Sequence, residues 1–128
     1  MIRMYNFDKQ NRSFTFSKAD RILKRPDFIH LSKYGIKIQN KNFVAVFQKG
    51  GIDRPRIGIT VSKRVGGAVT RNRLKRLVRE FFRLHKHLFT GYLDINIIAK
   101  KTASQRPSKE IYASLQDILD KMARRNAV

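Results

Sequence analysis

The chain has 128 residues, a length that suits one domain with a single hydrophobic core. Its 29 Lys and Arg residues far outnumber its 9 Asp and Glu residues, and the formal net charge is +20. A chain this basic binds polyanions, either nucleic acid or an anionic membrane surface. Cysteine is absent, which excludes disulfides, thiol catalysis and thiolate metal sites.

No apolar run approaches the length of about 18 residues that a membrane-spanning helix needs. The first residues, MIRMYNFDKQNRSF, lack the apolar centre of a signal peptide. We therefore expect a cytoplasmic protein without a membrane partner. Residues 1–24 are polar and basic and predict a flexible arm, in which SFTF alternates as a short strand would. Residues 25–128 then form the single folded domain.

The first half of this domain carries one helical and two strand patterns. RPDFIHLSKY has Pro26 and Asp27 in its first turn and Gly35 after its end, which predicts a short helix. Residues 36–48, IKIQNKNFVAVFQ, alternate and predict one strand or a bent pair of strands. KGGIDRP predicts a turn, and RIGITVSK predicts a strand that forms a hairpin with the preceding one.

The strongest helical pattern runs from Ala68 to about Phe89, with one apolar and one cationic face. The apolar face consists of Leu74, Leu77, Val78, Phe81, Phe82, Leu84, Leu88 and Phe89, together with His85 as a packed residue. LDINIIAK then predicts a buried strand, TASQRP a loop, and Ser108 the N-cap of a final amphipathic helix. This order of elements predicts an α+β sandwich, in which helices pack against one small sheet.

The charge of the long helix is too one-sided for an ordinary solvated face. Residues 54–86 contain eleven Lys or Arg residues and a single acid, Glu80. Lys75, Arg79 and Arg83 follow each other at four-residue spacing, where like charges destabilise a helix by a few tenths of a kcal/mol. Polyanion binding is therefore favoured over mere solvation. The excess of Arg over Lys favours forked pairing with phosphates and stacking on bases.

Three features have both a structural and a functional interpretation. Asn72 lies between two Arg residues and either satisfies backbone groups at the helix start or contacts a base edge or sugar. Gly66 and Gly67 either form a turn or let backbone approach a phosphate. Phe28 has helical spacing from Leu31 and is a core residue unless it lies at the edge of helix and sheet, where it could stack on an unpaired base.

Residues for bond chemistry are not grouped in this sequence. His30, His85 and His87 do not have the spacing of a metal site, and the acids are isolated and scattered. The glycine-rich loop lacks the pattern of a nucleotide-hydrolysing phosphate loop. We therefore expect no catalytic residue, no metal site and no cofactor bound by the protein alone.

The stretch RIGITVSKRVGGAVTRNRLKRLVREFFR resembles the bacterial ribonuclease P protein family, and RILKRPDFIHLSKYG and INIIAKK are also similar to it. The resemblance covers about residues 13–125. It implies a four-stranded sheet with three helices and a left-handed crossover around the RNR helix. From the sequence itself, a right-handed crossover would be the weak expectation.

The resemblance also implies a function. Family members are RNA-binding subunits of a ribonucleoprotein endoribonuclease, which removes the 5′ leader from precursor tRNA. Catalysis is implied to belong to the RNA subunit and its Mg²⁺ ions, and the protein binds the leader and stabilises the complex. The implied partners are the catalytic RNA and precursor tRNA, with the protein monomeric outside the ribonucleoprotein.

The site residues implied by this resemblance form two sets. The RNA-contact set consists of Lys63, Arg64, Arg71, Asn72, Arg73, Lys75, Arg76 and Arg79, and the 5′-leader cleft set consists of Phe28 and Phe43. The sequence departs from some relatives at Ser32 and Val46, where those relatives have aromatic rings. Base stacking in the cleft is therefore expected to be weaker or supplied by another residue.

Three alternatives remain at this point. One is another RNA-binding module, such as a ribosomal protein. A second is a peripheral membrane protein that uses the basic amphipathic helix, although the bulky apolar face is better explained by burial in the protein's own core. The third is a stand-alone nuclease, which the scattered acids do not support.

Overall fold

The computed structural model describes residues 21–22, 24–49, 55–89 and 93–125. The elements are α1 (Arg25–Tyr34), β1 (Ile36–Gln39), β2 (Phe43–Lys49), β3 (Arg56–Thr60), α2 (Ala68–His85), η3 (Lys86–Leu88), β4 (Leu93–Ala99), η4 (Lys101–Gln105) and α3 (Ser108–Arg124). The possible strand SFTF and most of the predicted turn KGGIDRP lie outside the described residues. Within the described chain, no helix is both long and apolar enough to cross a membrane.

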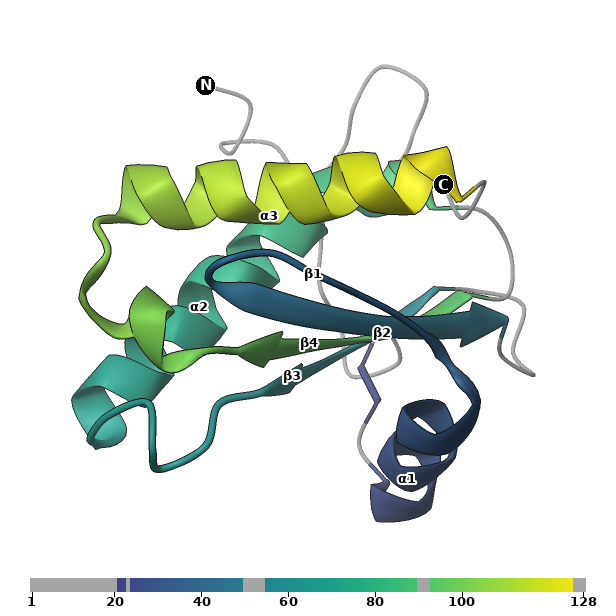
Figure 1. Cartoon of the computed structure of the whole chain (residues 1–128), viewed down its shortest axis with the longest axis horizontal. Helices are drawn as coiled ribbons and strands as arrows, with labels where there is room; N and C mark the ends of the chain where they lie inside the picture. The colour runs from purple at the N-terminus through teal and green to yellow at the C-terminus, as the bar shows by residue number, and fades with distance from the viewer. Residues whose placement is uncertain (1–20, 23, 50–54, 90–92, 126–128) are drawn as a thin grey trace.

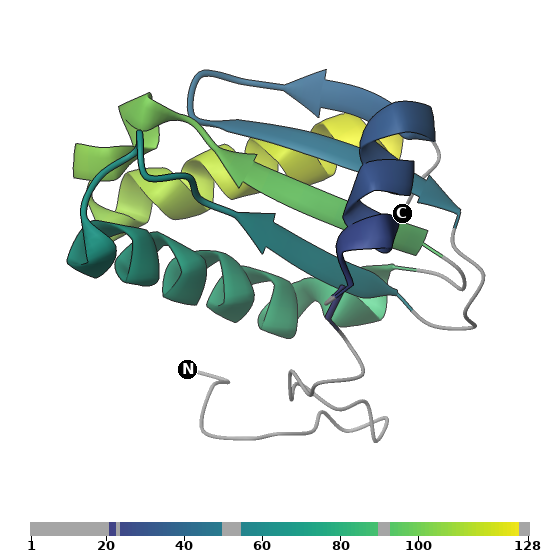
Figure 2. The same ribbon diagram turned by 90° about the horizontal axis from the view of Figure 1, so that it is seen from below.

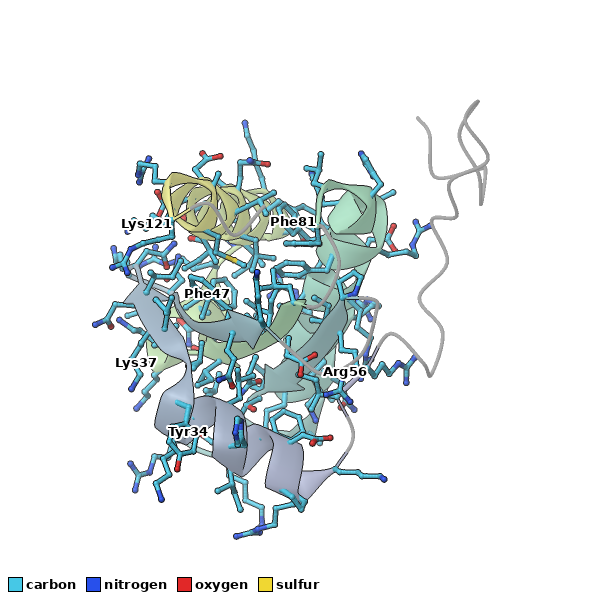
Figure 3. All side chains as sticks on the ribbon, turned by 90° about the vertical axis from the view of Figure 1, so that its right-hand side faces the viewer. Tyr34, Lys37, Phe47, Arg56, Phe81 and Lys121 are labelled. Carbon is cyan, nitrogen blue, oxygen red and sulfur yellow. The ribbon has the colours of Figure 1, made fainter. Side chains whose placement is uncertain are left out.

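The fold is the expected α+β sandwich. A four-stranded sheet has the order β1-β2-β4-β3, in which β3 and β4 are parallel and the other neighbours are antiparallel. Helices α2 and α3 cover one face of the sheet, and α1 lies against the other face (Figures 1 and 3). The main core fills the space between the sheet, α2 and α3, where Phe47 and Phe81 are seen in Figure 3.

The strand order differs from the prediction in one respect. The expected hairpin between β2 and β3 is wrong, because β4 lies between these two strands and pairs with both. The physical reason is the composition of β4, whose side chains are buried or half-buried on both faces. Such a strand is stable only in the interior of a sheet, which leaves β3 at the edge.

Residues 36–49 form the bent pair of strands, β1 and β2, that the alternation allowed. Asn40 stabilises the reversal between them, since its Oδ1 accepts hydrogen bonds from the backbone N–H groups of Asn42 and Phe43, both at 3.0 Å. Its Nδ2 donates to the carbonyl oxygen of Ser114 at 2.9 Å. The turn is thereby joined to α3.

The unit β3–α2–β4 connects two parallel strands. Figure 2 views the sheet from the α1 side, with both strands running in the same direction and α2 returning on the far side. The crossover from β3 to β4 is therefore left-handed, as the resemblance implied and against the usual preference for right-handed connections.

Helix α2 ends earlier than its apolar pattern predicted. The α-helix stops at His85, and residues 86–88 form the 3₁₀ turn η3. The turn leaves Leu88 exposed but places Phe89 in the core, where its ring stacks on Phe82 at a centroid distance of 5.6 Å. His85 is a packed residue, as expected, with its ring 4.1 Å from that of Phe81.

Two local predictions also needed correction. Pro107, not Ser108, is the N-cap of α3, and Ser108 is the first helical residue. The second concerns Ile22, which belongs to the folded body although it was assigned to the arm. Its side chain is buried, and its N–H donates to the carbonyl oxygen of Ile57 at 3.0 Å. Residues 1–20 and 23 of the predicted arm lie outside the described residues.

Arg56 fastens α1 to the sheet. Its guanidinium donates to both carboxylate oxygens of Asp94, at 2.9 and 2.8 Å, and lies 3.5 Å from Asp27 in α1. The side chains of Arg56 and Asp94 are each only 14% exposed. The hydrogen bond to Asp94 is the main cause that raises the pKa of Arg56 above its usual value. This forked pair therefore holds the first turn of α1 over the ends of β3 and β4.

Removal of this pair should destabilise the fold. We expect Arg56→Ala to lower the free energy of unfolding by about 1–3 kcal/mol, because Asp94 loses its partner while it stays largely covered. Arg106→Ala breaks the more exposed pair with Glu110 and should change stability by no more than about 0.5 kcal/mol. Urea unfolding of the two variants measures the difference, and equal losses would contradict this role of Arg56.

Candidate nucleic-acid interface

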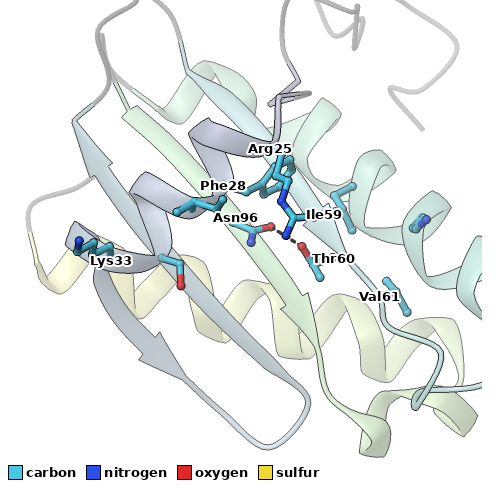
Figure 4. A pocket seen from close by; sticks show the side chains of 10 residues that line it. Arg25, Phe28, Lys33, Ile59, Thr60, Val61 and Asn96 are labelled. Carbon is cyan, nitrogen blue, oxygen red and sulfur yellow. Dashed lines mark hydrogen bonds between the residues drawn. The ribbon is translucent and has the colours of Figure 1, made fainter.

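A groove runs between α1, the edge of the sheet and α2 (Figure 4). Its volume is about 740 Å³. Helix α1 forms one wall and β3 and β4 form the floor, while Lys75 of α2 lies at the opposite side. The lining residues are Arg25, Phe28, Ile29, Ser32, Lys33, Ile59, Thr60, Val61, Lys75 and Asn96. The groove is therefore partly apolar and is bordered by cations.

A smaller hollow of about 160 Å³ adjoins the groove. Phe28, Ile59 and Lys75 line both spaces. Arg21 and Arg79 line the smaller hollow but not the larger groove. The two hollows together form a channel along β3 with cationic groups on the α2 side.

Phe28 lies where the sequence allowed it to be functional, at the edge between helix and sheet. Its ring is half-buried and packs directly on Gly58, so closely that a Cβ atom at that position would lie 2.5 Å from Phe28 Cε1. Beneath α1, Ile22, Leu31 and Val46 form a small apolar cluster against which Phe28 also packs. One part of the ring is thus fixed and another part faces the groove.

Phe43 does not belong to this groove, which corrects its assignment to the 5′-leader cleft. It is fully buried in the main core, on the face covered by α2 and α3. Side chains alternate along β2, so Val44 and Val46 face the α1 side instead. Of the two positions where an aromatic ring is missing, Ser32 lines the groove, whereas Val46 is covered by α1.

The RNA-contact residues predicted on α2 do not form one surface. Lys75 and Arg79 face the groove. Arg73 points the other way, and its Nη2 donates to the carbonyl oxygen of Arg106 at 2.8 Å. Arg71 donates from Nε to the carbonyl oxygen of Gly66 at 3.1 Å, and so closes the loop before the helix. Arg71 and Arg73 therefore have structural contacts besides any contact with RNA.

The remaining predicted contacts are exposed and lie together at the start of α2. Lys63 and Arg64 are in the loop after β3, and Asn72 and Arg76 are on the outer side of the helix. The side chain of Asn72 makes no hydrogen bond with any described residue, so the structural interpretation of Asn72 as a side-chain cap finds no support. At about 100° per residue, Asn72 and Arg76 lie within about 60° of Arg79, so this outer surface adjoins the groove side of the same helix.

The acids of the described chain are all engaged elsewhere. Asp27 and Asp94 contact Arg56, and Glu80 pairs with Arg83. Those of α3 contact Arg106, Gln116 and Lys121. None of these acids pairs with a residue of the RNA-contact set, which consequently keeps its positive charge for an external anion. Among the described residues, no group of three potential metal ligands occurs.

Besides Ser32, the two uncharged polar groove residues are Thr60 and Asn96, which the sequence reasoning missed. Both lie on the sheet face that α1 covers in part, and Thr60 Oγ1 is 3.1 Å from Asn96 Oδ1. A signal was present, because Asn96 is the one uncharged polar residue in the apolar run of LDINIIA. An amide in a strand buried on both sides indicates either an internal hydrogen bond or a ligand.

Fold and site together define a small basic nucleic-acid-binding protein of the α+β class. The sequence matches the ribonuclease P family over residues 16–123. A ribonuclease P protein component from Desulfatibacillum aliphaticivorans is 45% identical over 111 residues, which cover 87% of this chain and 94% of the relative. One from Staphylococcus haemolyticus is 42% identical over 102 residues and covers 80% and 89%. The chain belongs to the ribonuclease P protein family.

Solved structures agree with this assignment. The RNase P protein of Staphylococcus aureus matches with a TM-score of 0.77 and 39% identity, and covers 80% of this chain and 94% of that chain. The RNase P protein of Thermotoga maritima matches with a TM-score of 0.71 and 36% identity, and covers 79% and 96%. The alternative of an unrelated RNA-binding module is not favoured.

The contact between Phe28 and Gly58 generates a stability prediction. Gly58→Ala should lower the free energy of unfolding by about 1–3 kcal/mol, because the new methyl group must displace the Phe28 ring or shift α1. Gly67→Ala is the matched control, since a Cβ there meets nothing within 4 Å. Its effect should stay within about 0.5 kcal/mol. Thermal or urea unfolding distinguishes the two, and a neutral Gly58→Ala would disprove the tight packing of Phe28.

Proposed function

We propose that this chain is the RNA-binding protein subunit of ribonuclease P, which assists a catalytic RNA in removing the 5′ leader from precursor tRNA. The observation that carries the proposal is the set of cations on and before α2 that pair with no carboxylate of the described residues and lie beside a partly apolar groove. Family membership supports the same function.

The groove is the proposed site of the single-stranded leader. Lys75 and Arg79 provide positive charge along its α2 side, where phosphates can bind. Phe28 provides a face on which an unpaired base can stack, and such stacking tolerates any base. With Phe43 in the core and Ser32 in place of a ring, Phe28 is the only aromatic side chain among the lining residues of the groove.

The outer surface at the start of α2 is the proposed contact with the catalytic RNA. It consists of Lys63, Arg64, Asn72 and Arg76, all of which are exposed. This surface adjoins the groove along α2, so the leader and the catalytic RNA would bind side by side on the same helix. The protein would then lower the repulsion between two polyanions.

Bond cleavage is proposed to belong to the catalytic RNA, with Mg²⁺ ions held by that RNA. The acids of the described residues support this division, because each has a structural partner and they are not grouped as metal ligands. Cytoplasmic location and a monomeric state outside the ribonucleoprotein remain predictions of the same proposal.

Cleavage of precursor tRNA by the catalytic RNA, with and without this protein, tests the proposed function. Stimulation should be largest at low Mg²⁺ and low salt, where repulsion between the two RNAs is least screened. Protein that leaves cleavage at low Mg²⁺ unchanged would refute the proposal. Cleavage by the protein alone would refute the assignment of catalysis to the RNA.

The groove-lining and the outer cations of α2 should respond differently to mutation. Lys75→Ala should weaken binding of precursor tRNA to the assembled complex and leave binding of mature tRNA, which has no leader, within about twofold. Arg76→Ala should instead weaken assembly with the catalytic RNA. Each variant should reduce the salt dependence of the affected step by about one unit of log slope.

Lys109→Ala is the control for both, because it removes an exposed cation of α3 that belongs neither to the groove lining nor to the RNA-contact set. Fluorescence anisotropy over a series of salt concentrations gives the affinities and the slopes. Equal effects of Lys75→Ala and Arg76→Ala on both steps would show that the cations act only as a diffuse charge.

A further inference from the structure

Asn96 is an unusual residue for the floor of a stacking groove. Its side chain belongs to β4, in the interior of the sheet, and Asn96 is only 8% exposed. It nevertheless lines the groove and lies beside Phe28, since the Cβ position of Gly58 would be 2.5 Å from the ring and 3.4 Å from Asn96 Oδ1. Figure 4 shows Asn96 between Phe28 and Thr60.

The hydrogen bonds of this amide are only partly made within the protein. Thr60 Oγ1 donates to Asn96 Oδ1 at 3.1 Å, and no described residue accepts a hydrogen bond from Asn96 Nδ2. Asn42 provides the contrast, as the other buried Asn of the described chain. Its Nδ2 donates to Ser114 Oγ at 2.6 Å, inside the contact with α3. The donor of Asn96 has only the groove available.

The pair of Thr60 and Asn96 offers the groove a donor next to an acceptor. In the orientation described, Nδ2 is the donor and the lone pairs of Thr60 Oγ1 are the acceptor. With the amide turned over, Asn96 Oδ1 would be the acceptor and the Thr60 hydroxyl the donor. Both orientations therefore present the pattern that matches the edge of a nucleobase, where a donor and an acceptor also lie side by side.

We propose that Asn96 and Thr60 recognise the edge of one unpaired base, the base that stacks against Phe28 in the groove. The inference rests on the proposed function, in which this groove holds the leader. Stacking on Phe28 by itself tolerates every base. A covered amide discriminates among bases. A base without the complementary group displaces water from Asn96 Nδ2 and leaves this donor without a hydrogen-bond partner. The protein consequently discriminates among bases at one leader position, whereas the neighbouring nucleotides are bound through the charge of their phosphates.

Binding of precursor tRNA to the assembled complex tests the inference. Leader nucleotides are changed one at a time to A, G, C or U, and to unsubstituted purine, which stacks but has no exocyclic hydrogen-bonding group. We expect wild-type protein to discriminate among bases at one leader position by about fivefold or more. Purine at that position should bind more weakly than the preferred base.

Two variants remove the pair while keeping similar side-chain volume. Thr60→Val and Asn96→Leu should each reduce the discrimination at that position to less than about twofold, and should leave the affinity for the purine-substituted leader within about twofold of wild type. Thr102→Val is the control, because its hydroxyl donates to the carbonyl oxygen of Lys41, outside the groove. This control should keep the full discrimination.

The inference is overturned if no leader position discriminates, or if the discrimination survives in either variant. It is also overturned if both variants weaken binding of all leaders equally, because Asn96 and Thr60 would then have a structural role only. Thermal unfolding identifies a variant that does not fold, and the other variant then decides.

A measurement on the protein alone distinguishes this inference from the proposed function. The side-chain amide signal of Asn96 in a ¹⁵N NMR spectrum, identified by its loss in Asn96→Leu, should shift when a short single-stranded RNA is added. The signal of Asn42 should not shift. A protein that stimulates cleavage but leaves the Asn96 signal unmoved overturns the inference alone. A moving Asn96 signal without stimulation refutes the proposed function and supports the base contact.

Discussion

The burial of the apolar side of α2 is the interaction on which the rest of the structure depends. Leu74, Val78 and Phe82 are fully buried between the sheet and α3, and they fix the rotation of the helix about its axis. Like charges along the other side destabilise the helix by themselves, so packing must offset their repulsion. As a result, the cations are held at fixed positions on a rigid element, which reduces the entropy cost of binding RNA.

Acids are few in this chain. The described ones pair with residues that stabilise the fold and not with the cations that we propose to bind RNA. The described carboxylates lie where an ion pair or a hydrogen bond joins two parts of the fold, as Asp94 does with Arg56, or along the outer sides of α2 and α3. The groove and the start of α2 are left without them. Within the described residues, the cations that line the groove and those at the start of α2 therefore stay unneutralised by ion pairs.

Periodicity was sufficient to predict the elements and the apolar side of α2, because these depend on residues close together in the chain. It failed where distant segments compete for one position. The hairpin between β2 and β3 was wrong because β4, with a more apolar sequence, takes the central place between them. Phe43 was misplaced for a related reason, since the face to which a strand residue points depends on register, and a shift of one residue reverses it. The pairing of Thr60 with Asn96 could not be foreseen because it requires the parallel register of β3 and β4.

The short bridge between Arg21 and Ile57 determines where the N-terminal part of the chain reaches the body. Ile22 binds the outer edge of β3 through its backbone, which also protects this edge from pairing with another chain. Arg21 lines the smaller hollow next to Arg79, whereas α3 ends on the opposite face of the sheet. A fluorophore or affinity tag joined ahead of Arg21 would therefore be tethered next to the groove. The same label placed after α3 would be tethered away from it.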